Sequence, residues 1–332
     1  MQRVKITRRK SYFLISVSNR RNLDLCMKYA LAGFTNSING VWTFLDIKEG
    51  DFVSFLYGAK AYNLYVVESK EAIKNAENLP PWPPVTFKQS GNTYYFPFRL
   101  KLRPIRKFEE SLVRVEFNYV AENLLLRGGY RKTHFQADQT TLQAVSQMGT
   151  VWNDQADKLI ISNKEIFIPK FTKNRDKISL PEIFQFKELI LQALIREYLS
   201  ERANLSMLLQ QSEIYFESSK LEILGEKAFP EGFVDILIKE ATPTGISRKI
   251  IIEVKTDVAR EQDIEQIEGY ADEIGEECIG AILIAKKFSK KITQQTRSGK
   301  VKLFRYTLNK LVDACACFTF RELLEDFRIS RA

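Results

Sequence analysis

Histidine and cysteine are scarce in this sequence of 332 residues, which holds one histidine and four cysteines. With His134 alone, the chain cannot supply the two imidazoles of an HNH-type nuclease, a paired-histidine zinc site or a histidine-based hydrolase of RNA. The cysteines are Cys26, Cys278, Cys315 and Cys317, and because none forms a CxxC pair they predict neither a disulfide framework nor a zinc knuckle. We therefore expect His134 to be a structural or surface residue, and a catalyst that relies mostly on carboxylates, lysine and a metal ion.

Long apolar runs are also missing. No stretch approaches the ~18 residues of a membrane span, and the basic N-terminus lacks the apolar segment and cleavage site of a signal peptide. We therefore expect a cytoplasmic protein with no membrane partner. With 45% hydrophobic and 27% charged residues, the composition is that of a globular protein, and its length predicts two or three domains.

Positive charge is distributed unevenly along the chain. Residues 1–140 hold 22 Lys and Arg against 12 Asp and Glu, a net charge of +10, whereas residues 141–332 carry a net charge of −1. This asymmetry favours a polyanion-binding module in the first part of the chain. The alternative is a basic domain whose charge serves no partner.

Short aromatic and β-branched runs dominate the N-terminal part and favour a small β-barrel with helices. We expect strands at 11–18, around Trp42 after a turn at Asn39-Gly40, and at 51–58, 60–69 and 94–105, with a helix at 20–34. Four prolines within residues 79–84 exclude helix and central strand, so this stretch is predicted to be a rigid loop that presents Trp82.

The remainder of the chain changes in character at Pro181. Residues 141–180 are predicted to be a connector with a β-hairpin that turns at Ser162-Asn163-Lys164. Beyond it, apolar residues at helical spacing alternate with buried strands, which predicts an α/β sandwich around a mixed sheet over residues 181–332. The fold class expected for the whole chain is α+β with two domains, the first spanning residues 1–140.

Charged residues interrupt two apolar strands in the C-terminal part. Asp235 lies in GFVDILIKE, and Glu253 and Lys255 lie two residues apart in RKIIIEVKT, so the latter two face the same side of their strand. Charges beside a buried sheet are costly unless a metal or a partner compensates them. Carboxylates from adjacent strands suit Mg²⁺, with Mn²⁺ as a substitute. The alternative is a surface hairpin with a salt bridge between Lys255 and Asp235.

These residues resemble the acid–acid–lysine motif of the PD-(D/E)XK nuclease superfamily. The sequence from Gln266 to Tyr270 is similar to the QxxxY element of its RecB-like branch and of the archaeal mismatch endonucleases. The resemblance implies a restriction-endonuclease-like fold, metal binding by Asp235 and Glu253, and catalytic roles for Lys255, Gln266 and Tyr270. It also implies an acid on the first helix, for which Glu188 is the first candidate and Glu197 the second.

The N-terminal part resembles the PUA-like group that includes the EVE and YTH domains, through YFLISV, GVWT and KEGDFVSFLYG. The resemblance implies that Trp42 is one wall of an aromatic cage for a flipped, modified base, and Trp82 is a candidate second wall. Basic residues of the run 99–107 would contact DNA phosphates. They are Arg99, Lys101, Arg103, Arg106 and Lys107. The alternatives are a barrel-core position for Trp42, packing of the loop against the barrel for Trp82, and a merely solvated face for the basic run.

Taken together, the sequence predicts a Mg²⁺-dependent endonuclease that cuts double-stranded DNA in modification-dependent restriction. A homodimer is expected because cutting both strands needs two active sites. A mismatch- or structure-specific repair endonuclease and a non-catalytic nucleic-acid-binding protein are the alternatives. The sequence does not identify the base modification, the target sequence, the cut position or the dimer interface.

Overall fold

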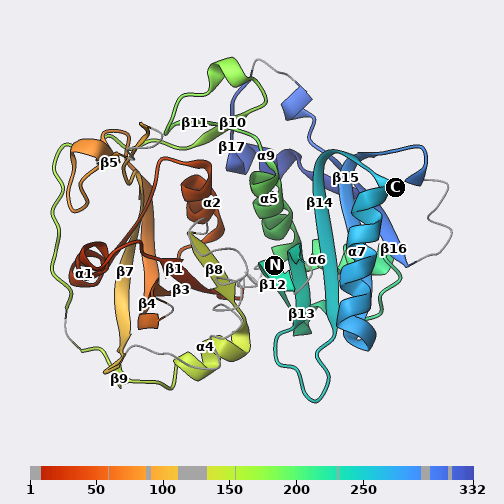
Figure 1. The fold of residues 1–332 in the computed structure, drawn as a ribbon, viewed down its shortest axis with the longest axis horizontal. Coiled ribbons are helices and arrows are strands. Elements are labelled where there is room, and N and C mark those ends of the chain that lie inside the picture. The colour runs from red at the N-terminus through yellow and green to blue at the C-terminus, as the bar shows by residue number, and fades with distance from the viewer. Residues whose placement is uncertain are drawn as a thin grey trace, which may run out of the picture.

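The computed structural model describes residues 9–58, 60–86, 91–110, 133–153, 155–229, 232–292, 300–312 and 316–332. Two large β-sheets lie on opposite sides of the molecule, the first built from the N-terminal half and the second from the C-terminal half (Figure 1). Helices α2 (Ile38–Asp46) and α5 (Glu188–Ser200) contact each other between the sheets. The mixed α+β class expected from the sequence is confirmed.

The N-terminal sheet has the strand order β2-β7-β4-β3-β1-β8, with β9 paired to β7. The pairs among the described residues leave this order open, so the predicted closed barrel is wrong for this part of the chain. One reason is that residues expected to form a strand around Trp42 form helix α2 instead. The bounds are β1 Tyr12–Ser16, β2 Leu31–Phe34, β3 Phe52–Tyr57, β4 Lys60–Ala72, β5 Val85–Thr86, β6 Thr93–Tyr94, β7 Phe98–Lys107, β8 His134–Ala137, β9 Thr150–Val151, α1 Arg20–Tyr29 and α4 Gln139–Val145.

Local capping explains the helices of this half. The side chain of Asn19 accepts a hydrogen bond from the backbone of Asn22 at 2.8 Å and caps the start of α1, which begins at Arg20 like the predicted helix. The helix ends at Ala30, whose φ of 45° is left-handed, so the predicted helix 20–34 stops early and continues as β2. Ser37 caps α2 in the same way as Asn19 caps α1. The apolar residues of α2 recur at helical spacing and are buried, which overrides the β-propensity around Trp42.

The predicted hairpin at 162–164 is not formed. Instead, the chain runs extended along the end of β4, where Phe167 N–H donates to Ala72 O at 3.0 Å and Lys74 N–H donates to Glu165 O at 2.8 Å. This pairing with a distant segment satisfies the backbone that a hairpin would have satisfied locally. A small sheet follows, made of β10 Lys170–Thr172, β11 Ile183–Gln185 and β17 Phe318–Thr319.

The C-terminal sheet is mixed, as predicted, with the order β12-β13-β14-β15-β16-β18. Strands β14, β15 and β16 are parallel, whereas β13 is antiparallel to both of its neighbours. Residues 293–299, between β15 and β16, lie outside the described residues. The bounds are β12 Leu221–Phe229, β13 Gly232–Glu240, β14 Lys249–Ala259, β15 Cys278–Phe288, β16 Val301–Thr307, β18 Arg328–Arg331, α6 Arg202–Gln211, α7 Glu261–Ile274 and α9 Phe320–Asp326. Short 3-10 turns span Ala76–Asn78, Arg175–Lys177, Ser218–Lys220, Gly275–Glu277 and Lys310–Val312.

Apolar burial joins the two halves. One cluster of buried residues includes Phe13 of β1 and Val41 of α2 together with Ile190 and Leu194 of α5 and Ile252 of β14. A second cluster packs α7 against the other face of β14 and β15. Helix α5 therefore packs directly on the C-terminal sheet and meets the N-terminal half through α2.

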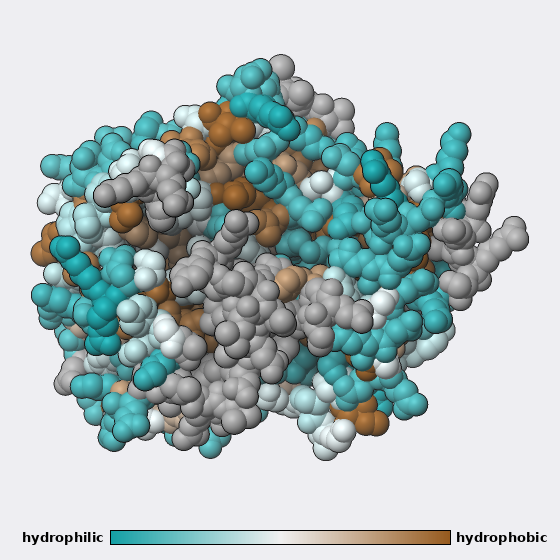
Figure 2. All heavy atoms as spheres, viewed as in Figure 1, coloured by the Kyte–Doolittle hydropathy of each residue, from teal (hydrophilic) through white to brown (hydrophobic). Residues whose placement is uncertain are grey.

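The face of the molecule seen in Figure 2 is mainly hydrophilic over α7, with apolar side chains gathered in small patches. Among the helices of the described segments, none combines the length and the apolarity that crossing a membrane requires.

Trp82 packs against the N-terminal sheet rather than standing free on its proline-rich loop. It is 4% exposed, and its ring centroid lies 5.4 Å from that of Phe96. A Cβ atom added at Gly33 of β2 would come within 2.4 Å of the indole ring. Glycine at this position is therefore required for the close approach of the ring to the strand.

We expect Gly33→Ala to lower the free energy of unfolding by about 1–3 kcal/mol, because the methyl group would overpack the contact with Trp82. Urea unfolding followed by circular dichroism measures this change. In a Trp82→Ala background the added methyl group has no ring to meet, so the cost of Gly33→Ala should largely disappear. An equal cost in both backgrounds would contradict the packing described here.

Candidate active site

Asp235 and Glu253 come from neighbouring antiparallel strands. The last residues paired between β13 and β14 are Ile236 and Ile252, and Asp235 and Glu253 each lie one residue beyond this last pair. The charge of Glu253 contributes to the raised pKa of Asp235, so the two carboxylates are close enough to interact. Both side chains are buried, at 8% and 3% exposure. The predicted pair of acids is thus brought together beside the sheet.

Hydrogen bonds fix the carboxylate of Asp235 at both oxygens. Gln192 of α5 donates its Nε2 to Oδ1 at 2.6 Å, and the backbone N–H of Val254 donates to Oδ2 at 2.8 Å. Burial, followed by the charge of Glu253, raises the pKa of Asp235 well above its usual range. Gln192 was not predicted from the sequence, although an amide within the apolar stretch LILQALI, four residues after Glu188, was a usable signal.

Lys255 is the cation of the site. Its Nζ lies 2.8 Å from Oε1 of Glu253 and 3.7 Å from Oδ1 of Asp263. Burial opposes the charge of Lys255, but the carboxylates, Glu253 first, outweigh burial and raise its pKa. The pKa of Glu253 is raised by burial despite this partner. Lys255 therefore stays protonated beside two buried acids, and the alternative of an exposed hairpin with a Lys255–Asp235 bridge is not observed.

Helix α7 brings the QxxxY residues to the same place. Gln266 donates its Nε2 to Tyr270 Oη at 2.9 Å and approaches Oε1 of Glu253 at 3.4 Å. Tyr270 Oη in turn accepts the backbone N–H of Phe233, near the start of β13, at 3.1 Å. The two residues therefore connect α7 to both strands that carry the acids.

Of the two helix acids, Glu188 is the one near the site. It begins α5 and is half-buried. Burial raises its pKa and Lys255 lowers it, and its own charge contributes to the raised pKa values of Asp235 and Glu253. Glu197 instead forms an ion pair with Lys48 at 3.1 Å.

The donor set fits Mg²⁺. Oε2 of Glu253 is buried with no hydrogen-bond partner in the described parts of the chain, which is costly for a carboxylate. No group of three or more His, Cys, Asp or Glu side chains within the described ranges is arranged to hold a metal. Asp235 and Glu253 would therefore act as a pair, with water and phosphate oxygens completing the shell, as Mg²⁺ sites built on one or two carboxylates do.

Trp42, predicted to be one wall of a base-binding cage, is a buried side chain. Trp42 is 4% exposed, and its ring makes an edge contact with the ring of His134, with centroids 4.6 Å apart. Like Trp82, it is part of the apolar cluster that joins the two halves. Neither tryptophan is open to a flipped base, so the alternatives fit better: a core position for Trp42 and packing of its loop against the sheet for Trp82.

The basic run divides into one buried and four more accessible side chains. Arg99 is fully buried and donates to the carbonyl oxygens of Leu79, Pro80 and Phe96, so its predicted contact with phosphate is wrong. Lys101 and Arg103 are exposed, and their side-chain nitrogens lie 3.9 and 3.6 Å from the carboxylate of Glu68. Arg106 is half-buried and donates to the carbonyl oxygens of Met148 and Gly149. Lys107 is exposed, and its ammonium lies near the ring of Trp152. These four remain candidates for contact with a polyanion.

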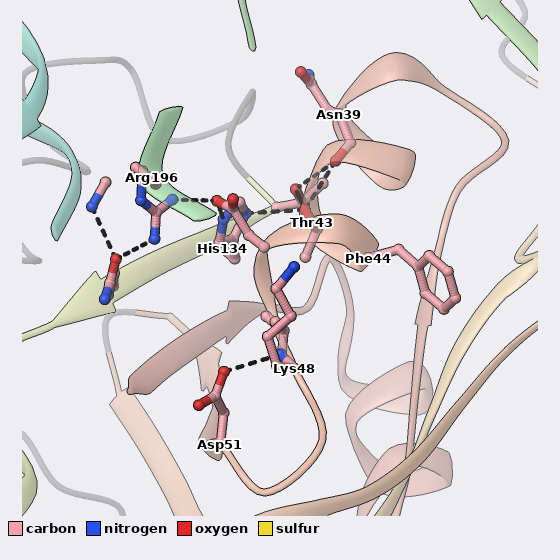
Figure 3. A network of polar contacts seen from close by, with 12 residues as sticks. Asn39, Thr43, Phe44, Lys48, Asp51, His134 and Arg196 are labelled. Atoms are coloured by element: carbon pink, nitrogen blue, oxygen red, sulfur yellow. Dashed lines mark hydrogen bonds and ion pairs between the residues drawn. The ribbon is translucent and has the colours of Figure 1, made fainter. Parts of the chain in front are cut away.

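His134 takes part in a buried polar network between α2, β8 and α5 (Figure 3). Its Nε2 lies 2.9 Å from Oδ2 of Asp46, and its Nδ1 lies 2.9 Å from Oγ1 of Thr43. This acid–histidine–hydroxyl order is that of a hydrolase triad. However, Thr43 is fully buried and His134 is 4% exposed, so no substrate reaches the hydroxyl. Of the structural and surface roles expected for His134, the structural one agrees with this burial.

The chain matches no protein-family model and no curated protein. Among solved structures it is similar to EndoMS in a complex with double-stranded DNA (18% identity, 31% of this chain and 42% of that chain, TM-score 0.22). It is also similar to a repair endonuclease from Pyrococcus abyssi (15%, 47% and 68%, TM-score 0.23) and to the DNA modification-dependent restriction endonuclease AspBHI (11%, 82% and 62%, TM-score 0.21). The chain spans less than half the length of the EndoMS chain that it matches.

Proposed function

We propose that this protein is a Mg²⁺-dependent endonuclease that hydrolyses phosphodiester bonds in double-stranded DNA, with Mn²⁺ as a substitute metal. The observation that carries the proposal is the pair of buried, interacting acids, Asp235 and Glu253, with Lys255 beside Glu253. A buried carboxylate oxygen without a partner next to a second buried acid is unfavourable in the absence of a cation. A bound divalent ion removes that cost.

A Mg²⁺ ion at this pair would neutralise charge on the phosphate and lower the pKa of a bound water molecule. The chain itself orients the site. Gln192 and the backbone of Val254 hold Asp235 in one orientation, so it needs little reorganisation. The ammonium of Lys255 attracts the scissile phosphate. Glu188, whose pKa is raised, is placed to hold a proton during attack by water.

The remaining residues of the site support the same geometry. Gln266 links Glu253 to Tyr270, and Tyr270 anchors α7 to β13. Exposed side chains of the N-terminal half, Lys101, Arg103 and Lys107, can bind the DNA backbone without regard to sequence.

For the finer function we propose modification-dependent restriction in the prokaryotic cytoplasm, by a homodimer that places one site on each strand. Because Trp42 and Trp82 are buried, the modified base would be read by other groups of the N-terminal half. Cleavage of mismatched or branched DNA in repair is the alternative, and the same catalytic residues would serve it.

The deciding experiment uses matched plasmids, unmodified, adenine-methylated and cytosine-modified, together with a duplex that contains a single mismatch, each incubated with protein and Mg²⁺. We expect cleavage of one modified plasmid above the others. Preferential cleavage of the mismatched duplex would replace restriction by repair. If no substrate is cleaved with Mg²⁺ or Mn²⁺, the proposed nuclease activity is wrong, and the alternative of a non-catalytic nucleic-acid-binding protein remains.

Asp235→Asn, Glu253→Gln and Lys255→Ala should each lower the single-turnover cleavage rate by at least about 100-fold, because each removes a charged group next to the scissile phosphate. The matched control is Glu265→Gln, an exposed acid on α7, which should cleave at the wild-type rate. Retention of full activity in Asp235→Asn or Glu253→Gln would place catalysis elsewhere.

Mg²⁺ should raise the thermal unfolding midpoint of the wild-type protein, because a ligand that binds only the folded state stabilises it. The gain is about 2.7 kcal/mol at a free ion concentration 100 times the Kd. Scanning calorimetry with and without Mg²⁺ measures the shift. We expect it to disappear in Glu253→Gln and persist in Glu265→Gln. An equal shift in all three proteins would show that the ion binds outside this site.

A further inference from the structure

Three polar residues of α5 lie on one face of the helix. Glu188, Gln192 and Arg196 are spaced four residues apart, so their side chains are neighbours along the helix surface. The first two contact or electrostatically influence the proposed site, and Gln192 donates directly to Asp235. The third, Arg196, points to the N-terminal half of the molecule (Figure 3).

Arg196 is bound on two sides by the N-terminal half. Its Nη1 donates to Oδ2 of Asp46, the last residue of α2, at 2.6 Å, and its Nη2 donates to Oε1 of Gln136 in β8. The two charged side chains are 10% and 3% exposed. Although burial opposes it, the charge of Arg196 helps to hold the pKa of Asp46 at about 2. The guanidinium is therefore in a buried ion pair with a fixed direction.

The two acceptors of Arg196 are themselves held in place. Asp46 Oδ2 also receives Nε2 of His134. Gln136 Oε1 accepts the backbone N–H of Gly225 in β12 at 2.8 Å, and Gln136 Nε2 donates to Ile223 O at 3.2 Å. A Cβ atom added at Gly225 would lie 2.7 Å from Nη1 of Arg196, so glycine leaves the space that the guanidinium occupies.

We propose that Arg196 is a positioning residue of the nuclease, and that its ion pair with Asp46 sets the placement of α5 and so of Gln192 against Asp235. The N-terminal half thereby becomes part of what makes the active site competent. One helical turn separates Arg196 from Gln192, so a shift at one end of this turn is transmitted to the other. A displacement of ~1 Å near the reacting groups is enough to lower a rate about 100-fold. The inference rests on the proposed function.

Arg196→Gln and Asp46→Asn remove the charge of either partner. We expect each to lower the single-turnover cleavage rate about 10- to 100-fold while the Kd for DNA, measured by fluorescence anisotropy, changes less than about threefold. Arg196→Lys restores the charge without the double donation and should recover part of the rate. The matched control is Asp138→Asn, which breaks the 2.7 Å ion pair with Lys239 across the same interface but leaves α5 untouched. This control should lose stability and keep the wild-type rate.

A second readout does not require cleavage. The side-chain amide of Gln192, assigned in a two-dimensional ¹H–¹⁵N spectrum by its loss in Gln192→Leu, should shift in Arg196→Gln and Asp46→Asn but not in Asp138→Asn. If the wild-type protein cleaves no DNA, the nuclease fails while this spectrum still tests the positioning. An unmoved Gln192 signal, or rate losses in all variants that only follow their loss of stability, would overturn the role of Arg196.

Discussion

Two carboxylates buried close to each other are the constraint on which the rest of the site depends, because the neighbouring groups must compensate the cost of their burial. Asp235 and Glu253 each lose solvation, and each raises the cost of ionising the other. The surrounding groups reduce this cost one at a time, through a protonated Lys255, the amide of Gln192 and the N–H of Val254. Among the described residues of the site, Oε2 of Glu253 and Oε1 of Gln192 remain buried without a hydrogen-bond partner, and in the proposed function a cation would compensate the carboxylate oxygen.

The fold brings these groups together from separate parts of the chain. Strands β13 and β14 supply the acids and the lysine, α7 supplies Gln266 and Tyr270, and α5 supplies Glu188 and Gln192. Because α5 packs on the C-terminal sheet and meets the N-terminal half through α2, the helix that orients Asp235 is also the helix that the N-terminal half holds through Arg196. The orientation of Asp235 and the contact between the halves thus depend on two residues of the same helix, one turn apart.

Sequence reasoning succeeded where the pattern was local. The apolar strands around Asp235 and Glu253 were predictable because charges stood out in them, and α7 was predictable from its amphipathic spacing. Gln192 was missed because its partner lies 43 positions away in the sequence. The strand expected around Trp42 was wrong because the Ser37 cap and helical apolar spacing outweighed β-propensity. The predicted phosphate contact of Arg99 failed because its burial depends on a loop that arrives from another part of the chain.

Arg99 shows that a basic residue can add to the net charge of a protein without adding to the charge of its surface. A proline-rich loop presents carbonyl oxygens but few N–H groups, and the guanidinium beneath it provides the missing donors. Arg99 therefore stabilises the loop by donating hydrogen bonds to its backbone carbonyl oxygens. Its contribution to a formal net charge is therefore not a contribution to the face that a polyanion can touch, and counts of basic residues set an upper limit on the size of such a face.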